Sequence, residues 1–307
     1  MIVIVVAEQV LNGVQFGITL FLMAAGLTLI FGVMNLVNLA HGSLYMIGAF
    51  IAAATFNAVH SFLLAILAAL VGTAAVGIVI EVVVFRSLYQ RDHLDQVLAT
   101  FGLILFFNEA VRMIWGATAL YAQVPQFLSG QVEVLPGVPY PAYRLAIIGV
   151  GLVVALAIYL LVMRTRIGML IRAGASDRTM VAALGVNITL LYTAVFGLGA
   201  ALAALSGALA GPIFTVESGM GDDLLILAFV VIVIGGIGSI RGAFIAAVLV
   251  GVVDTIGRAF LRPLFALFMS GFAADNAGPA VASMLIYVLM ATVLFFRPEG
   301  LFPRAKR

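Results

Sequence analysis

The sequence predicts an all-α, polytopic integral membrane helix bundle with eight or nine transmembrane elements. Of its 307 residues, 64% are hydrophobic and only 9% are charged, whereas soluble domains typically contain about 25% charged residues. Residues 9–80 contain no Asp, Glu, Lys or Arg, and one helix needs only about 20 apolar residues to cross a membrane. The apolar runs lack the polar–apolar alternation of a membrane β-barrel, so helices are the expected spanning elements.

Each expected span is an apolar run that ends near charged residues, glycine or proline. The spans are placed at 10–33, 36–56, 61–85, 97–115, 143–163, 189–212, 224–240, 242–258 and 279–296. No loop is long enough to form a separate domain, so residues 1–307 are expected to be one transmembrane domain. The longest loop, 116–142, is expected to be periplasmic.

A glycine-rich segment near 235–242 interrupts the apolar sequence between the seventh and eighth runs. It contains Gly235, Gly236, Gly238 and Gly242, and each glycine weakens a helix by about 1 kcal/mol relative to alanine. Helices that break at membrane depth can line a cavity, and the alternative is a tight turn between two spans. Both interpretations remain open, as does the choice between eight and nine spans.

Loop charges orient the bundle by the positive-inside rule. Three basic segments are assigned to the cytoplasm: Arg86 and Arg91; Arg164, Arg166, Arg172 and Arg178; and Arg297, Arg304, Lys306 and Arg307. The charged residues of the opposite loops, 116–142 and 213–223, are all acidic. This assignment puts the C-terminus in the cytoplasm and the N-terminus outside, and it leaves Arg258 and Arg262 as exceptions on the outer side.

The second basic segment, 164–188, is a polar island between two long apolar runs. It contains the pattern of two short helices, of which the first ends at Gly174. Ser176 or Asp177 can cap the second, and Gly185 can terminate it. The segment has too many apolar residues for a freely solvated loop, so it should lie on lipid headgroups or fit a groove on a partner.

A second polar cluster lies between the first two spans, in NLVNLAHGS. It includes Asn38, His41 and Ser43. Polar residues at membrane depth usually face the bundle interior and mark a transport pathway. The competing interpretation is a short cytoplasmic turn.

Small residues recur at helical spacing in two spans. Gly199, Ala203, Gly207 and Gly211 form one stripe, and Ala65, Ala69, Thr73 and Gly77 form another. Such stripes let helix backbones approach closely. Ser206 could serve an intramembrane hydrolase if a histidine base approached it, but packing is the simpler interpretation.

Several function classes are disfavoured by what the sequence lacks. The only lysine is Lys306, so a GxxxxGK[ST] phosphate loop is excluded and any nucleotide energy must come from another subunit. The three histidines lack carboxylates at ligand spacing, so no metal site is expected, and the scattered basic residues do not predict nucleic-acid binding. The charged residues of the spans fall near predicted span ends, which disfavours a proton-coupled carrier. They are Glu81, Glu109, Arg112 and Asp254.

Four ordered sequence blocks resemble the permease subunits of branched-chain amino acid ABC importers, specifically the first of the two paired permeases. They are NGVQFGITLFLMAAGLTLIFGVMNLVNLAHGSLYMIGAF at 12–50, GMLIRAGASDRTMVAALGVN at 168–187, GGIGSIRGAF at 235–244 and RPEGLF at 297–302. The set covers most of the chain. The resemblance implies a translocation subunit of the bacterial inner membrane that has no enzymatic site.

The same resemblance implies partners and a coupling site. The expected partners are a second homologous permease, two ATP-binding subunits that hold the ATP, and a periplasmic substrate-binding protein; this chain holds no cofactor. Loop 164–188 would be the cytoplasmic coupling loop that docks on the ATPase, through Arg172, Ala173, Asp177, Arg178 and Gly185. Asn38, His41, Ser43, Gly235, Gly236 and Gly238 are the candidates for the translocation pathway.

Some residues depart from the family pattern and keep alternatives open. Ser43 stands where the family more often has an acidic residue, and Arg241 where proline is usual. The solute could therefore be urea, an amide or another amino acid instead of leucine, isoleucine or valine. An ion-coupled secondary transporter is the alternative from another class.

Overall fold

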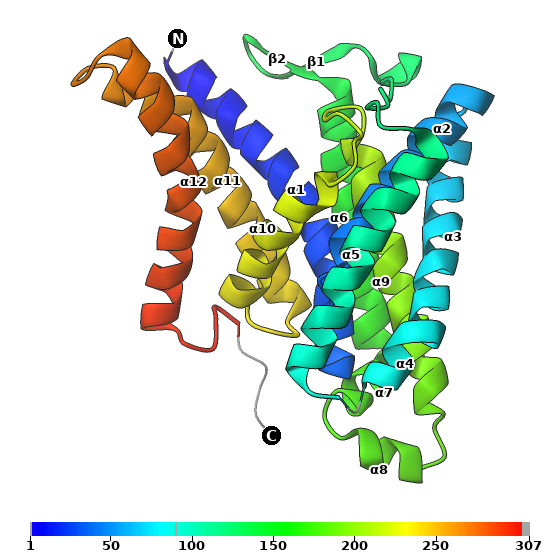
Figure 1. Cartoon of the computed structure of the whole chain (residues 1–307). Helices are drawn as coiled ribbons and strands as arrows, with labels where there is room; N and C mark the ends of the chain where they lie inside the picture. The colour runs from blue at the N-terminus through cyan, green and yellow to red at the C-terminus, as the bar shows by residue number, and fades with distance from the viewer. Residues whose placement is uncertain (1, 90, 303–307) are drawn as a thin grey trace. The chain divides into compact units, whose positions relative to one another are not determined.

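The computed structural model describes residues 2–89 and 91–302, and these residues are almost wholly helical (Figure 1). The helices are α1 Ile2–Met34, α2 His41–Val59, α3 Phe62–Ile80, η1 Glu81–Phe85, α4 Arg86–Leu88, α5 His93–Trp115, α6 Ala142–Arg164, α7 Arg166–Gly174, α8 Arg178–Ala183, α9 Ile188–Ala210, α10 Met220–Gly235, α11 Ile240–Phe265 and α12 Gly271–Phe296. The loop before α6 holds a 3-10 turn, η2 Gln126–Leu128, and an antiparallel hairpin of β1 Gln131–Leu135 and β2 Val138–Pro141. Arg304, Lys306 and Arg307 lie outside the described residues.

Eight helical segments within the described residues are long and apolar enough to cross a membrane. They confirm the predicted polytopic, all-α class. One of them, Phe62–Leu88, joins α3, η1 and α4 into a continuous run. The shorter α10 has 16 residues, which at 1.5 Å per residue is about 24 Å and less than the roughly 30 Å hydrocarbon core.

The chain forms two compact units. The first unit consists of the residues up to Phe21, residues 125–153, and the residues from Phe229 onward. The second unit consists of residues 22–124 and 154–228. The helices α1, α6 and α10 are each divided, with one end in the first unit and the other end in the second.

The second unit is built on the mutual packing of α2, α3 and α9. The buried positions of α3 are Ala65, Ala69, Thr73, Gly77 and Ile80, so the small-residue stripe of this helix is its packed face. On α9, Gly207 lies directly against the backbone of Tyr45 in α2, where a Cβ would overlap the Tyr45 carbonyl oxygen. Small side chains therefore set how closely these helices approach.

The first unit joins the start of α1 to α11, and α11 to α12. Cβ atoms at Gly13 and Gly17 would lie 2.6 and 2.7 Å from backbone atoms of α11. The Asn12 side chain accepts hydrogen bonds from Tyr140, at 3.0 Å, and from Arg144. These bonds attach the β-hairpin and the start of α6 to α1.

The glycine-rich segment forms a tight turn between α10 and α11. Gly236 and Gly238 have positive φ angles of +97° and +79°, which glycine adopts without strain. The C-terminal RPEGLF segment closes this turn, because Leu301 N donates to Ile234 O at 2.8 Å and Phe302 N to Gly235 O at 3.1 Å. Two blocks that are far apart in sequence thus form one structure that satisfies the last carbonyls of α10.

The last two spans begin or end elsewhere than predicted. Helix α11 continues to Phe265 with Pro263 inside it, and α12 begins at Gly271 with Pro279 inside it. Asp254 therefore lies within a span and is 5% exposed, so its predicted position near a span end is wrong. Arg258 lies one turn further along α11 and pairs with Asp254 at 2.8 Å, so the helix can continue past both charges.

Candidate functional site

The polar island folds as the two short helices expected from its sequence. Thr165 caps α7, because its hydroxyl accepts from Gly168 N at 3.0 Å and donates to Leu161 O at 2.6 Å. Ile171 and Gly174 are buried, and α7 packs against both α8 and α9. The island is therefore attached to α6 before it and to α9 after it.

Arg172 and Ala173 are both partly buried within the island. The half-buried Arg172 guanidinium donates a hydrogen bond to the carbonyl of Val162 near the end of α6. A cation at this position satisfies a free carbonyl and interacts favourably with the negative end of the helix dipole. The structure thus gives Arg172 a contact within the chain. The Ala173 carbonyl accepts hydrogen bonds from the backbone N–H groups of Ser176 and Asp177.

Asp177 is the residue that caps α8. Its Oδ1 accepts from the backbone N–H groups of Thr179 and Met180, both at 3.0 Å, and from the Thr179 hydroxyl at 2.6 Å. The hydroxyl of Thr179 and the amide of Met180 stabilise the charged carboxylate and hold the pKa of Asp177 below its ordinary value. Gly185, with φ +84°, follows the end of α8, as expected for a glycine that terminates a helix.

The island exposes both apolar and basic side chains. Met180 is 59% exposed and Leu184 is 76% exposed, although neither belongs to a candidate span. Ile167 and Met169 of α7 are also more than half exposed, and Arg178 of α8 is exposed. We call these five residues the α7–α8 surface.

A buried polar cluster lies at the start of α2. Asn38, His41 and Ser43 are each at most 1% exposed. Within the described residues, neither amide atom of Asn38 has a hydrogen-bond partner, and the same holds for Ser43 Oγ and His41 Nδ1. His41 Nε2 lies 3.3 Å from the Met23 carbonyl oxygen, so it donates this bond and Nδ1 is left as an acceptor.

These orphaned atoms are unusual, because buried polar side chains nearly always have hydrogen-bond partners. Tyr45 OH and Thr28 Oγ1, also buried in the second unit, likewise have no partner among the described residues. A buried set of unpaired donors and acceptors is what a path for a polar solute would require. In contrast, Gly235 ends α10, and Gly236 and Gly238 lie in the turn that leads to α11; Gly235 and Gly236 pack closely against backbone atoms.

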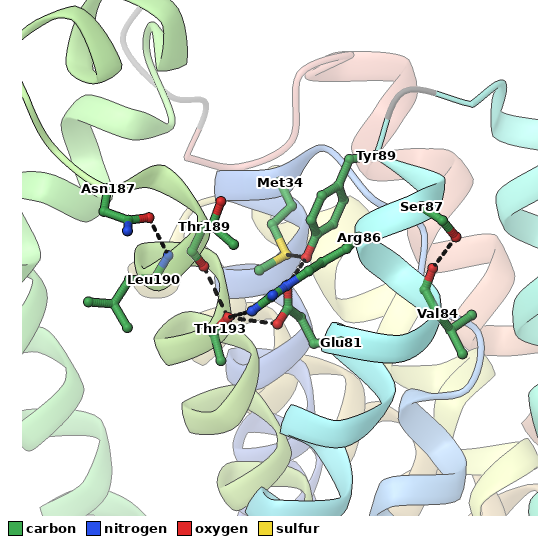
Figure 2. Close-up of polar contacts among 10 residues, drawn as sticks. All are labelled: Met34, Glu81, Val84, Arg86, Ser87, Tyr89, Asn187, Thr189, Leu190 and Thr193. Atoms are coloured by element: carbon green, nitrogen blue, oxygen red, sulfur yellow. Dashed lines mark hydrogen bonds and ion pairs between the residues drawn. The ribbon is translucent and has the colours of Figure 1, made fainter.

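A further polar network centres on Glu81, and sequence reasoning missed it. Figure 2 shows the Glu81 carboxylate between Arg86 and Tyr89 on one side and Thr193 on the other. Its Oε1 accepts from Tyr89 OH at 2.8 Å and from Arg86 Nε at 3.3 Å, and its Oε2 accepts from Thr193 Oγ1 at 2.7 Å. The only signal in the sequence was an acid and a base five residues apart near a span end.

The comparisons with known proteins decide the family. A family model described as the permease component of the branched-chain amino acid transport system matches residues 9–294. The chain belongs to this family. BraD of Pseudomonas aeruginosa, a permease protein of a high-affinity branched-chain amino acid transport system, is 31% identical over 97% of this chain and 95% of its own length.

Other relatives extend the match beyond one organism. The LivH permease protein of Escherichia coli K12 is 29% identical, covering 95% of this chain and 96% of LivH. A probable LivH permease of Methanocaldococcus jannaschii is 22% identical over 96% of this chain. No solved structure matches the chain. As a family member with eight candidate spans among its described residues, this permease is a multi-pass membrane protein.

Proposed function

We propose that this permease is the membrane-spanning subunit of an ABC importer that carries branched-chain amino acids across the bacterial inner membrane. Separate subunits hydrolyse the ATP. The proposed assembly contains this chain, a second homologous permease, two ATP-binding subunits and a periplasmic substrate-binding protein. The C-terminus and loop 164–188 are cytoplasmic in this proposal, and loop 116–142 faces the binding protein.

The observation that carries the proposal is the α7–α8 surface. Exposed methionine and leucine side chains outside the spans would be costly in water, and an apolar helix face of this kind fits a groove on a partner. Asp177 fixes the start of α8, and Arg178 adds a charge for pairing across the interface. In this account Arg172 and Ala173 act indirectly, by holding the island against the end of α6.

The buried cluster of Asn38, His41 and Ser43 is the proposed contact for the polar end of the solute. The ammonium and carboxylate groups of an amino acid need acceptors and donors when they leave water, and these side chains offer both. The apolar residues of the surrounding helices suit a branched aliphatic side chain. Serine at position 43 adds no charge to this pathway.

The experiment that tests the docking proposal is co-purification with the ATPase subunits. Replacing Met180 by Glu puts a charge on the apolar surface, and we expect ATPase recovery to fall about tenfold or more, as for a disrupted interface centre. Ser129→Glu, on the exposed loop before β1, is the matched control and should leave recovery unchanged. Equal recovery of the ATPases with both variants would rule out the α7–α8 surface as the docking site.

A further inference from the structure

Glu81 is a fully buried carboxylate in a chain that has few charges. Its side chain is 0% exposed, whereas that of its partner Arg86 is 41% exposed. Removing a carboxylate from water is unfavourable unless it is paired and its oxygens accept hydrogen bonds. Both Glu81 oxygens accept here, so the network of Glu81, Arg86, Tyr89 and Thr193, which we call the Glu81 clasp, satisfies the buried charge.

The clasp joins two elements that are far apart in sequence. Glu81, Arg86 and Tyr89 belong to or directly follow the helical run Phe62–Leu88, whereas Thr193 belongs to α9. The Arg86 guanidinium also donates to Thr193 Oγ1, at 3.1 Å. The Thr193 hydroxyl of α9 therefore contacts both charges (Figure 2).

Aromatic contacts on either side of Thr193 extend the same junction. The rings of Tyr89 and Tyr192 meet edge to face with centroids 5.2 Å apart, and those of Phe85 and Phe196 lie 5.1 Å apart. Burial, together with the hydrogen bond to Glu81, raises the pKa of the Tyr89 phenol above its usual range. Tyr89 therefore stays protonated and continues to donate to the carboxylate.

The clasp lies close in sequence to the α7–α8 surface. The Asn187 side chain caps α9 by accepting a hydrogen bond from Leu190 N at 3.0 Å. Asn187 lies two residues after Gly185, which terminates α8. A short, regular stretch of α9 then leads from Asn187 to Thr193. On the other side, Glu81 begins a π-helical turn, η1, and such turns are frequent at functional sites because they depart from regular helix geometry.

We propose that Glu81 is a positioning residue for energy coupling, which ties the α3–α4 run to the start of α9 so that both move when α7–α8 is displaced. A partner that moved α9 alone would remove the Thr193 bond from a buried carboxylate. Because that loss is unfavourable, the α3–α4 run follows α9. The inference rests on the proposed function, since it assigns the clasp a part in ATP-driven transport.

The test compares Thr193→Val with Thr193→Ser in the complete transporter reconstituted in liposomes. Valine keeps the volume of threonine and removes the hydroxyl, and serine keeps the hydroxyl. The readout is the number of ATP molecules hydrolysed per radiolabelled leucine taken up. We expect Thr193→Val to raise this ratio about fivefold or more, in the range of allosteric coupling effects, with assembly and basal ATP hydrolysis unchanged. Thr193→Ser should stay within about twofold of the unmodified protein.

The matched control is Thr292→Val on α12, where the hydroxyl donates to the Val288 carbonyl one turn before it at 2.8 Å. This variant should leave the ratio unchanged. Glu81→Gln, which removes the buried charge, should raise the ratio as Thr193→Val does. An unchanged ratio in Thr193→Val, a serine variant as impaired as the valine variant, or a parallel loss of assembly would overturn the proposal. If the unmodified complex shows no ATP-dependent leucine uptake, it is the proposed function that fails, before any variant is compared.

Discussion

Single small residues determine how closely the helices of the second unit approach. Gly207 of α9 lies against the backbone of Tyr45 in α2, with no room for a Cβ. Gly102 of α5 provides the contrast, because a Cβ there would meet no atom within 4 Å. The same substitution at these two helical glycines should therefore have opposite effects.

Gly207→Ala should destabilise the protein by about 1–3 kcal/mol, because an added methyl group in a tightly packed interface forces the backbones apart. Gly102→Ala should be stabilising by about 0.5–1 kcal/mol, since alanine loses less conformational freedom in a helix. Thermal unfolding in detergent measures both effects. Equal melting temperatures for the two variants would contradict the packing described for Gly207.

Asp177 should make the start of α8 sensitive to acid. Its lowered pKa means that the cap stabilises the folded helix above the ordinary carboxyl pKa of about 4. This stabilisation is lost as the pH falls through the lower pKa of the folded state. Hydrogen exchange at the amides of Thr179 and Met180, corrected for intrinsic rates, should show protection that is constant from pH 7 to about pH 4 and then declines.

Asp177→Asn is the control for this titration, because an asparagine oxygen can still cap the helix but has no charge to lose. Its protection should not depend on pH over the same range. Protection in the unmodified protein that declines well above pH 4 would show that another group controls α8.

Residues with local partners were predictable, and those with distant partners were not. The Asp177 cap and the Gly185 terminator act within one or two turns of their own positions, so spacing alone predicts them. Glu81 meets Thr193, which lies 112 residues away, and a threonine in an apolar helix gives no sign of such a role. The orphaned atoms of Asn38 and His41 are likewise visible only when burial is known.

At the scale of whole elements, the C-terminal segment and the α10–α11 turn depend on each other. A Cβ at Gly300 would lie 2.6 Å from backbone atoms of Gly236, and Gly300 also has φ +84°. Gly137, in the hairpin, has a similar φ of +80°, but its nearest neighbour would be 3.8 Å away. Substitution at Gly137 would therefore introduce backbone strain alone, whereas substitution at Gly300 would introduce both strain and steric overlap.

Gly137→Ala should cost about 1–2 kcal/mol, from the left-handed conformation alone. Gly300→Ala should cost about 1–3 kcal/mol more, because the methyl group also displaces the turn. Melting temperatures in detergent again give the comparison. If the two variants are equally stable, the RPEGLF segment does not pack on the turn as described.

The helix ends illustrate what sequence patterns miss in a membrane protein. The last span is predicted at 279–296 and so begins at Pro279, a residue type that is common in the first turn of a helix. The structure instead starts α12 at Gly271, where the Ser270 hydroxyl caps it by accepting from Ala273 N at 3.4 Å. Ion pairs also shift helix ends from where the sequence places them. Arg262 pairs with Asp275 at 2.5 Å, which allows α11 to continue through its basic residues.

For the whole molecule, composition predicts the class, whereas the number of crossings depends on α10. Eight crossings would leave both ends of the chain on one side of the membrane. In the proposed orientation, with the C-terminus in the cytoplasm and the N-terminus outside, the short α10 acts as a ninth crossing. Its length alone would not suggest this.

Cysteine labelling tests the crossing directly, because the chain has no native cysteine. Single cysteines at Ser129, Ser176 and Pro298 report on loop 116–142, loop 164–188 and the C-terminal segment. With an impermeant maleimide added to intact cells whose outer membrane is permeabilised, we expect labelling at position 129 only. Labelling at 298 without labelling at 176 would mean that α10 does not cross.

The source of energy is the central claim for the whole molecule, and uptake by purified components tests it most directly. Liposomes would contain this permease with its partner permease and ATPases, the binding protein and radiolabelled leucine outside, and ATP inside. We predict uptake that requires ATP and all the subunits, and no uptake by this chain alone under a proton or sodium gradient. Leucine accumulation by this chain alone, driven by such a gradient without ATP, would contradict the account.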